Sequence, residues 1–242
     1  MARIVVFQHN DHESPGRLGL TLRDNGFKLD FRRPDVDGVD AIPVDLDNVQ
    51  GVIVMGGQQN VTDGLPWMQA EIAFVAKAHA AQLPVVGVCL GAQVIAKALG
   101  GEVEPMDTPE VGFAPVNIVG PGQTDRITAG IRWSSPQFHT HAQQITRLPD
   151  GAALLASSEA CKVQAFYAGI RTFGFQYHFE LDRKQIDTLF EADAAFFDKA
   201  GVTRDQLSVQ ADEHYATYAR LGDRLCVNIA SFAFTFEELL KA

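Results

Sequence analysis

The first half of the chain alternates short apolar runs with longer segments of helical periodicity, and this alternation constrains the fold more than any other feature. A short, fully apolar run suits a strand that is buried on both faces, whereas a helical period places apolar side chains on one face of a helix. The alternation therefore predicts an α/β fold. We expect a mainly parallel, partly mixed sheet with helices on both faces.

The element boundaries follow from this pattern and from Pro and Gly punctuation. The predicted strands cover residues 3–8, 27–32, 51–55 and 84–88. The predicted helices cover residues 15–25, a segment that begins at Pro66, and residues 91–99. Proline is favoured in the first turn of a helix, and Gly100-Gly101 provides a typical helix end.

The pattern changes after residue 101. Four short strand candidates, separated by Pro, Gly and Asp, lie at 115–119, 152–156, 162–166 and 171–177. Such punctuation is typical of turns, so we expect an antiparallel extension of the sheet.

Beyond residue 180 the sequence is helical. One apolar stripe consists of Ile186, Leu189, Phe190, Ala194 and Phe197, and a second consists of Leu225, Ile229, Phe232, Phe236 and Leu239. No linker or repeat separates these stripes from the rest of the chain. We therefore expect a single domain over 1–242, with a core of about 1–182 and a helical C-terminal extension of about 183–242.

Composition excludes several classes of partner. The formal net charge of −10 opposes non-specific binding to nucleic acid or to an anionic membrane surface. No apolar run approaches the ~18 residues that a membrane span needs, and we expect no export signal because the first residues enter a strand-like run at once. The cysteines are odd in number, at 89, 161 and 226, with no CxxC pair. These features predict a cytoplasmic protein whose partners are small molecules or other proteins.

Cys89 lies in a Gly-x-Cys-x-Gly pattern between an apolar strand and a helix. Small residues two positions to either side allow a sharp turn, which places the cysteine at the tip of a strained elbow. Backbone N–H groups and the positive end of the helix dipole lie beside such a residue and can stabilise an oxyanion. The alternative is a buried cysteine at a strand end, because short patterns of this kind also recur by chance.

His178 and Glu180 lie two residues apart in a strand-like stretch, so they share one face. A carboxylate there can hold the imidazole while its other nitrogen faces a nucleophile. Together with Cys89, the pair predicts a Cys-His-Glu triad. A cysteine-dependent α/β-hydrolase is the rival fold, but that class places its acid before its histidine.

These motifs resemble those of the class I glutamine amidotransferases, particularly stand-alone proteins similar to the amidotransferase domain of GMP synthetase. The pattern at residues 87–93 is similar to the family's G-x-C-x-G-x-Q, and residues 174–180 resemble its G-x-Q-F-H-P-E. Gly56-Gly57 matches a Gly-Gly turn of the family. The resemblance spans about residues 50–180 and implies a flavodoxin-like amidotransferase architecture, here with extra C-terminal helices.

The resemblance also implies residue roles. Cys89 would be the nucleophile, His178 the general base and then acid, and Glu180 the residue that orients it. The backbone N–H groups of Gly57 and Leu90 would form an oxyanion hole, and Gln93 would contact bound glutamine.

The sequence departs from the family at three places. Gln58 replaces a proline after the Gly-Gly turn, Phe179 replaces the proline between histidine and acid, and residues 140–143 read T-H-A-Q where the family has W-H-G-D. Loops at strand ends shape specificity, so these changes bear on the substrate. The last sixty or so residues exceed the minimal family domain and could form a homodimer surface or cover the site.

The predicted reaction is hydrolysis of the γ-carboxamide of glutamine or of a γ-glutamyl compound, which releases glutamate and ammonia or an amine. Two alternatives stay open: a glutaminase subunit that delivers ammonia to a separate synthetase or other acceptor, and a non-catalytic binding or regulatory protein. We expect no cofactor and no metal. His9, His12, His139 and His141 have no recognisable metal-ligand spacing, although His141 could lie near the site by the resemblance.

Overall fold

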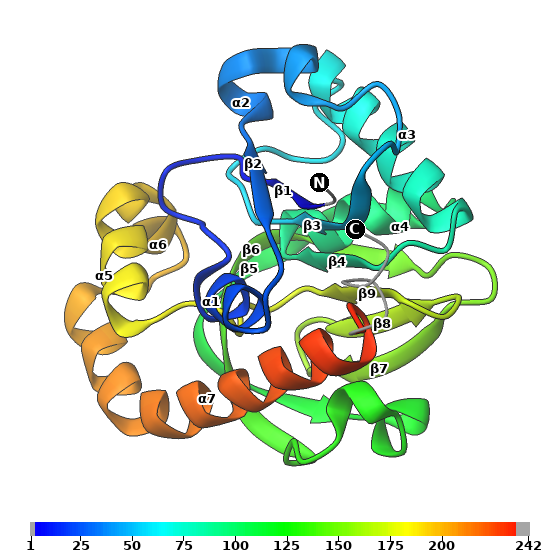
Figure 1. The fold of residues 1–242 in the computed structure, drawn as a ribbon. Coiled ribbons are helices and arrows are strands. Elements are labelled where there is room, and N and C mark those ends of the chain that lie inside the picture. The colour runs from blue at the N-terminus through cyan, green and yellow to red at the C-terminus, as the bar shows by residue number, and fades with distance from the viewer. Residues whose placement is uncertain (1–2, 236–242) are drawn as a thin grey trace.

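The computed structural model describes residues 3–235, within which nine strands form one sheet in the order β2-β1-β3-β4-β9-β8-β7-β5-β6 (Figure 1). Half of this sheet is parallel. Its strands are β1 (Arg3–Phe7), β2 (Leu29–Arg32), β3 (Val49–Val54), β4 (Val85–Val88) and β9 (Thr172–Phe175). Each pairs with its neighbour in parallel register, as the apolar runs predicted for β1, β2, β3 and β4. The prediction was wrong for β9, which was expected in the antiparallel extension but pairs with β4 in parallel.

The other half of the sheet is antiparallel. It consists of β8 (Ala165–Ala168), β7 (Ala153–Ser157), β5 (Glu102–Ile118) and β6 (Ser134–Arg147). β9 joins the halves, because it is parallel to β4 and antiparallel to β8. The mixed sheet agrees with the predicted fold class, and its antiparallel half is larger than the short strand candidates suggested.

Helices cover both faces of the parallel half (Figure 1). Successive side chains of a strand point to opposite faces, so Ile4 and Val6 pack towards α1 (Gly16–Asp24) and α7 (Arg204–Phe232). Val5 and Phe7 lie in a second apolar cluster with α3 (Pro66–Ala80) and α4 (Leu90–Ala98). The short helix α2 (Pro34–Asp37) and the 3-10 turns η1 (Gly38–Ala41), η2 (Gly120–Gln123) and η3 (Arg126–Thr128) lie in connections.

Three C-terminal helices, α5 (Arg183–Ala192), α6 (Ala194–Lys199) and α7, complete the structure. Capping boxes at Asp182 and Thr203 fix the starts of α5 and α7. A third apolar cluster joins these helices to β5 and β6 through Phe113, Phe138 and Tyr218. The C-terminal helices therefore pack directly on β5 and β6 of the antiparallel half.

Several predicted boundaries were wrong. The 115–119 candidate is the end of the much longer strand β5, and only the alternation of His139 and His141 indicated the strand β6. Both strands mix buried with exposed positions and carry prolines, so they lack a continuous apolar run. Two further candidates are displaced: 162–166 corresponds to β8, and the 171–177 strand ends at Phe175.

The last helix also differs from its prediction. α7 begins at Arg204, well before the predicted stripe, and Phe236 and Leu239 lie outside the described residues. Its first turns were missed because they carry few large apolar residues, among which Leu207 packs in the third apolar cluster. Within residues 3–235, no helix combines the length and the apolarity that a membrane crossing requires.

Gly222 allows α7 to approach the chain just before Glu180. A Cβ atom at this position would lie 2.4 Å from the Phe179 carbonyl oxygen. We expect Gly222→Ala to destabilise the protein by about 1–3 kcal/mol in urea unfolding, although alanine is otherwise the better helix former by about 1 kcal/mol.

The matched control is Ala216→Gly at an exposed position of the same helix, which should cost about 1 kcal/mol from helix propensity alone. If Gly222→Ala instead raised the free energy of unfolding by the amount that Ala216→Gly lowers it, the close approach of α7 to Phe179 would be absent.

Candidate active site

Cys89 occupies a strained turn between β4 and α4. Its backbone has φ 54° and ψ −109°, a region that side-chain-bearing residues rarely adopt. The amide of Cys89 donates a hydrogen bond to the Phe175 carbonyl at 2.8 Å, which ties the turn to β9. Such strain persists only where the surrounding structure holds it, and it is concentrated at functional sites.

The glycine two residues after Cys89 makes this turn sterically feasible. A Cβ atom on Gly91 would lie 1.9 Å from the carbonyl oxygen of Val54, at the end of β3. No side chain fits there, so the first turn of α4 packs directly on the backbone of β3. The sequence predicted a sharp elbow at this place, and the contact with β3 gives its physical reason.

His178 and Glu180 form a buried pair just beyond β9. His178 Nδ1 lies 2.8 Å from Glu180 Oε1, and both side chains are fully buried. Burial alone would lower the pKa of His178, but the Glu180 carboxylate and the neighbouring Cys89 thiol outweigh it, so the pKa is raised well above its usual value. The pair lies outside the strand that was predicted for it, since His178 makes only an isolated bridge to Phe138.

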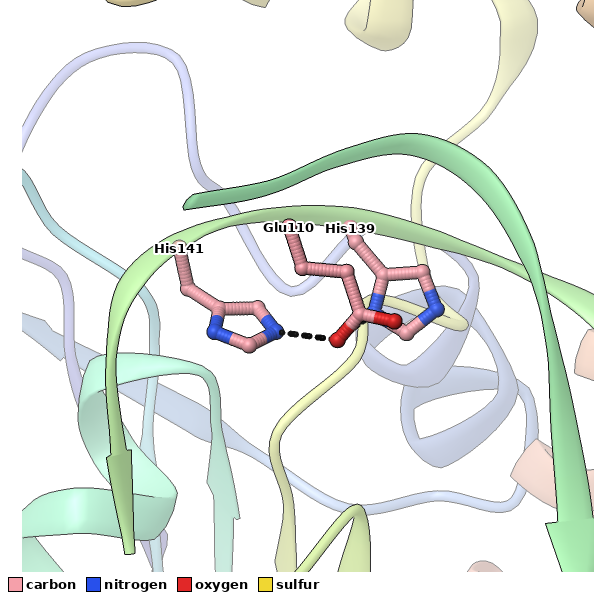
Figure 2. Close-up of side chains that lie close together, drawn as sticks. All are labelled: Glu110, His139 and His141. Atoms are coloured by element: carbon pink, nitrogen blue, oxygen red, sulfur yellow. Dashed lines mark ion pairs between the residues drawn. The ribbon is translucent and has the colours of Figure 1, made fainter. Parts of the chain in front are cut away.

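The strand β6 forms the wall opposite Cys89. His139 and His141 alternate on one face of this strand and meet Glu110 of β5, all three being buried (Figure 2). Burial lowers the pKa of His139 to about 3, although Glu110 opposes the effect. Between the two histidines, Thr140 turns its carbonyl oxygen towards Cys89.

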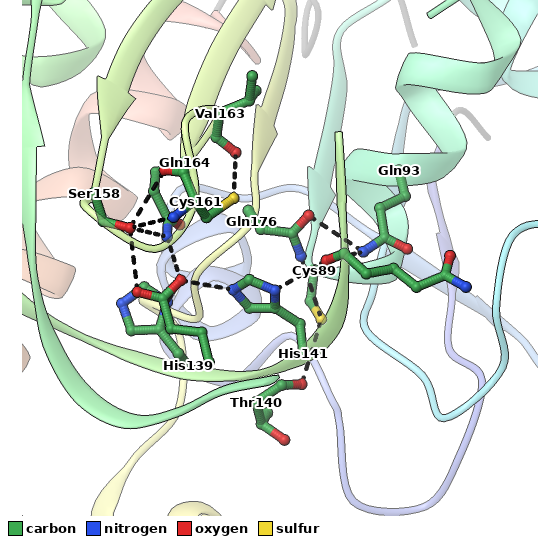
Figure 3. Close-up of polar contacts among 12 residues, drawn as sticks. Cys89, Gln93, His139, Thr140, His141, Ser158, Cys161, Val163, Gln164 and Gln176 are labelled. Carbon is green, nitrogen blue, oxygen red and sulfur yellow. Dashed lines mark hydrogen bonds and ion pairs between the residues drawn. The ribbon is translucent and has the colours of Figure 1, made fainter. Parts of the chain in front are cut away.

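The thiol of Cys89 lies between two polar groups (Figure 3). Its Sγ atom is 3.9 Å from the Thr140 carbonyl oxygen and 3.9 Å from Gln176 Nε2. Gln93, from the first turns of α4, donates through Nε2 to the Gln143 carbonyl at 3.3 Å and to Gln176 Oε1 at 3.2 Å. A hydrogen-bond network thus joins the elbow, β6 and the segment after β9.

The sequence-predicted residues border one pocket of about 270 Å³, whose lining includes Gly57, Cys89, Leu90 and Gln93. Leu90 is the first residue of α4, so its N–H group has no acceptor within the helix. His178 and Glu180 are buried behind the pocket. Its outer wall comes from α5, α6 and the residue between them, through Leu189, Asp193, Phe196 and Lys199.

Glu13 is a buried acid in this pocket that the sequence analysis missed. Its Oε1 atom lies 3.7 Å from His178 Nε2, on the side of the ring opposite Glu180. Burial raises the pKa of Glu13, and the charge of His178 only partly offsets this. The sequence offered only a weak signal, namely a polar residue in the loop after β1, near the carboxyl end of the sheet.

His9 holds the loop around Gly56, a role that the sequence analysis did not predict. Its Nδ1 atom lies 3.0 Å from the Gly56 carbonyl oxygen, and its Nε2 atom lies 3.1 Å from Glu71 Oε2. The ring also stacks on Trp67. Burial opposes the charged form, but Glu71 outweighs it and the pKa of His9 is raised. This buried pair fixes the turn that carries Gly57 to the pocket.

Comparison with known proteins identifies the family. A family model described as glutamine amidotransferase class-I matches residues 18–195. The chain belongs to the class I glutamine amidotransferase family.

Individual relatives agree with this assignment. A glutamine-hydrolyzing GMP synthase subunit of Sulfolobus acidocaldarius is 37% identical over 138 residues, which cover 57% of this chain and 70% of that protein. The glutamine-hydrolyzing GMP synthase of Porphyromonas gingivalis is 30% identical over 185 residues, which cover 76% of this chain but 34% of that protein. A crystal structure of a glutamine amidotransferase from Methylobacillus flagellatus superposes with a TM-score of 0.84 at 25% identity, covering 96% of both chains.

Glu13 generates a prediction about this amidotransferase site. An ionised carboxylate stabilises the imidazolium form of a nearby histidine, so Glu13→Gln should lower the pKa of His178. The effect should be present at pH values above the raised pKa of Glu13, where that group carries charge. NMR titration of the ring nitrogens of His178 measures it.

Asp193→Asn is the matched control, because it removes a carboxylate from the outer wall of the same pocket. It should leave the titration of His178 nearly unchanged. An unchanged titration in Glu13→Gln, or equal changes in both variants, would contradict a direct interaction between Glu13 and His178.

Proposed function

We propose that this amidotransferase hydrolyses the γ-carboxamide of glutamine or of a γ-glutamyl compound, with Cys89 as nucleophile. One observation carries the proposal: a cysteine on a strained elbow lines a pocket beside a buried His178–Glu180 pair. Family membership supports the reaction class. The roles of the individual residues rest on this geometry and on chemistry.

In the first half-reaction, the Cys89 thiolate attacks the carboxamide carbon and the carbonyl oxygen becomes an oxyanion. Backbone N–H groups of Gly57 and Leu90 stabilise it, a contribution of about 2.7–4 kcal/mol per donor in comparable sites. His178 then gives its Nε2 proton to the leaving nitrogen. Ammonia or an amine departs, and a γ-glutamyl thioester remains on Cys89.

In the second half-reaction, neutral His178 takes a proton from water, which attacks the thioester carbon. The second tetrahedral intermediate collapses to glutamate and the Cys89 thiolate, and His178 is again protonated. Glu180 holds Nδ1 of the ring throughout, so Nε2 stays directed at the nucleophile. The raised pKa of His178 suits a residue that carries a proton beside the Cys89 thiolate before the first half-reaction and again after the second.

The charges around the pocket support an amino-acid substrate. Glu13 lies beside the catalytic pair, while Asp193 and Lys199 lie on the outer wall. A glutamine or γ-glutamyl group carries both an ammonium and a carboxylate at the end remote from its amide, so acidic and basic side chains can bind it together. Gln93 holds the inner wall through its bonds to Gln143 and Gln176.

The triad yields a kinetic prediction, because a base that transfers protons should cost more to lose than an acid that orients it. We expect His178→Asn to reduce glutamate release by about 10⁴-fold or more, and Glu180→Gln to reduce it less. The double variant should be little slower than His178→Asn. Steady-state rates on one γ-glutamyl substrate test this, and independent, multiplicative losses would exclude a single catalytic unit.

A second function is delivery of ammonia to a separate synthetase. It is favoured by the relatives, since one is named as a subunit of GMP synthase and another matches this chain over only 34% of its length. An amidotransferase of this kind needs a partner that uses the ammonia. The extra C-terminal helices at the pocket wall supply a surface that a partner could contact.

Release of glutamate and ammonia by the purified chain distinguishes the two functions. We expect turnover of glutamine or a γ-glutamyl amide without a partner, because the proposed nucleophile lines the pocket and the proposed base and orienting acid are buried behind it in the same chain. Cys89→Ser is the control for contaminating glutaminase. If the chain were inactive alone and became active with a co-purified synthetase, delivery of ammonia to that partner would replace the stand-alone function.

A further inference from the structure

Glu110, His139 and His141 form a buried cluster (Figure 2), and His141 also lines the pocket. The strand register brings them together, because Glu110 of β5 pairs with His141 of β6 and His139 lies two residues away on the same face. The side chains are 6%, 0% and 2% exposed, respectively. One potential ligand atom from each lies within 4.8 Å of the other two.

The hydrogen bonds of the cluster leave electron pairs facing one another. His141 Nδ1 lies 3.0 Å from the Gln143 carbonyl oxygen, which can only accept, so this nitrogen carries the ring proton. In the neutral ring, Nε2 then directs a lone pair at Glu110 Oε2, 3.2 Å away. Two acceptors that face each other repel, so a proton or a metal cation must lie between them.

His139 adds a third donor of electron pairs to the same point. Its Nδ1 atom lies 3.5 Å from Glu110 Oε2. Among the described residues, neither nitrogen of this fully buried ring has a hydrogen-bond partner of normal geometry. Burial of an unpaired polar group costs free energy, which a ligand at this position would recover.

We propose that Glu110, His139 and His141 bind a divalent first-row transition-metal ion, for which zinc is the natural probe. Two imidazoles and a carboxylate are a common ligand set for such ions. Bonds of about 2.0–2.1 Å at tetrahedral angles place ligand atoms roughly 3.3–3.5 Å apart. The two separations from Glu110 Oε2, 3.2 and 3.5 Å, match this spacing, and the ligand nitrogens of the two histidines lie within 4.8 Å of each other.

The groups around the cluster support the same inference. Metal-ligating residues are usually held by a further layer of hydrogen bonds. Gln164 Nε2 donates to Glu110 Oε2 at 2.7 Å, and Ser158 Oγ lies 3.2 Å from Glu110 Oε1. The Gln143 carbonyl orients His141 in the same way.

A bound ion would stabilise the pocket wall. The proposed ligands His139 and His141 lie on either side of Thr140, whose carbonyl oxygen faces the thiol of Cys89. The Gln143 carbonyl connects His141 to Gln93 as well, since it accepts from both side chains. The proposal does not depend on glutamine hydrolysis, because the site can be loaded and measured in an inactive protein.

The test is a calorimetric titration of Zn²⁺ into the chelator-treated full chain carrying Cys89→Ser, which removes the pocket thiol as a competing ligand. We expect one ion per chain. In this background Glu110→Gln and His139→Ala should each weaken binding by about 100-fold or more, and Gln164→Ala by about 10–100-fold. Bound Co²⁺ should give the absorption of a nitrogen- and oxygen-ligated ion without a thiolate charge-transfer band.

His214→Gln is the matched control, because it removes a partly exposed histidine of α7 and should leave the affinity unchanged. Circular dichroism verifies that each variant is folded, and Glu110→Gln preserves the shape of the cluster if His139→Ala does not fold. Absence of stoichiometric binding would mean that no metal ion occupies the point between Glu110 and the two histidines. Binding that survives both ligand substitutions would place the ion elsewhere, and either result would overturn the proposal.

Discussion

The direct contact between the first turn of α4 and the end of β3 is the constraint on which the site depends. A Cβ atom on Gly91 would lie 1.9 Å from the Val54 carbonyl oxygen, so only glycine permits this contact. Cys89, the one residue between β4 and α4, makes the turn with a positive φ. The hydrogen bond from Cys89 to Phe175 then ties the same turn to β9. Strain at one residue is thus held by three strands that belong to the rigid centre of the sheet.

The junction between the two halves of the sheet brings the remaining groups to this elbow. β9 is parallel to β4 and antiparallel to β8, so the segment that leaves β9 carries Gln176 and His178 past Cys89. β6 reaches the same place from the antiparallel half, where its Thr140 carbonyl meets the thiol. The pocket therefore has one wall from each half and an outer wall from the C-terminal helices.

The sequence was most informative where one local pattern corresponds to one local structure. The buried parallel strands and the elbow helix were predicted because they are continuous apolar runs or clear helical faces. The fold class and the family assignment were confirmed, and the structure brings Cys89, His178 and Glu180 together. Their catalytic roles stay a prediction. β5 and β6 were missed in large part because half-exposed strands with prolines resemble loops.

The sequence by itself determined the α/β architecture, the position of the elbow and the residue types of the candidate triad, since each follows from near neighbours in the chain. Only the tertiary structure decided that Glu13 faces His178 and that His9 pairs with Glu71. It also decided that Glu110 meets two histidines of β6. These contacts join residues that are distant in the chain, and their distances depend on strand register and helix packing, which no local pattern specifies.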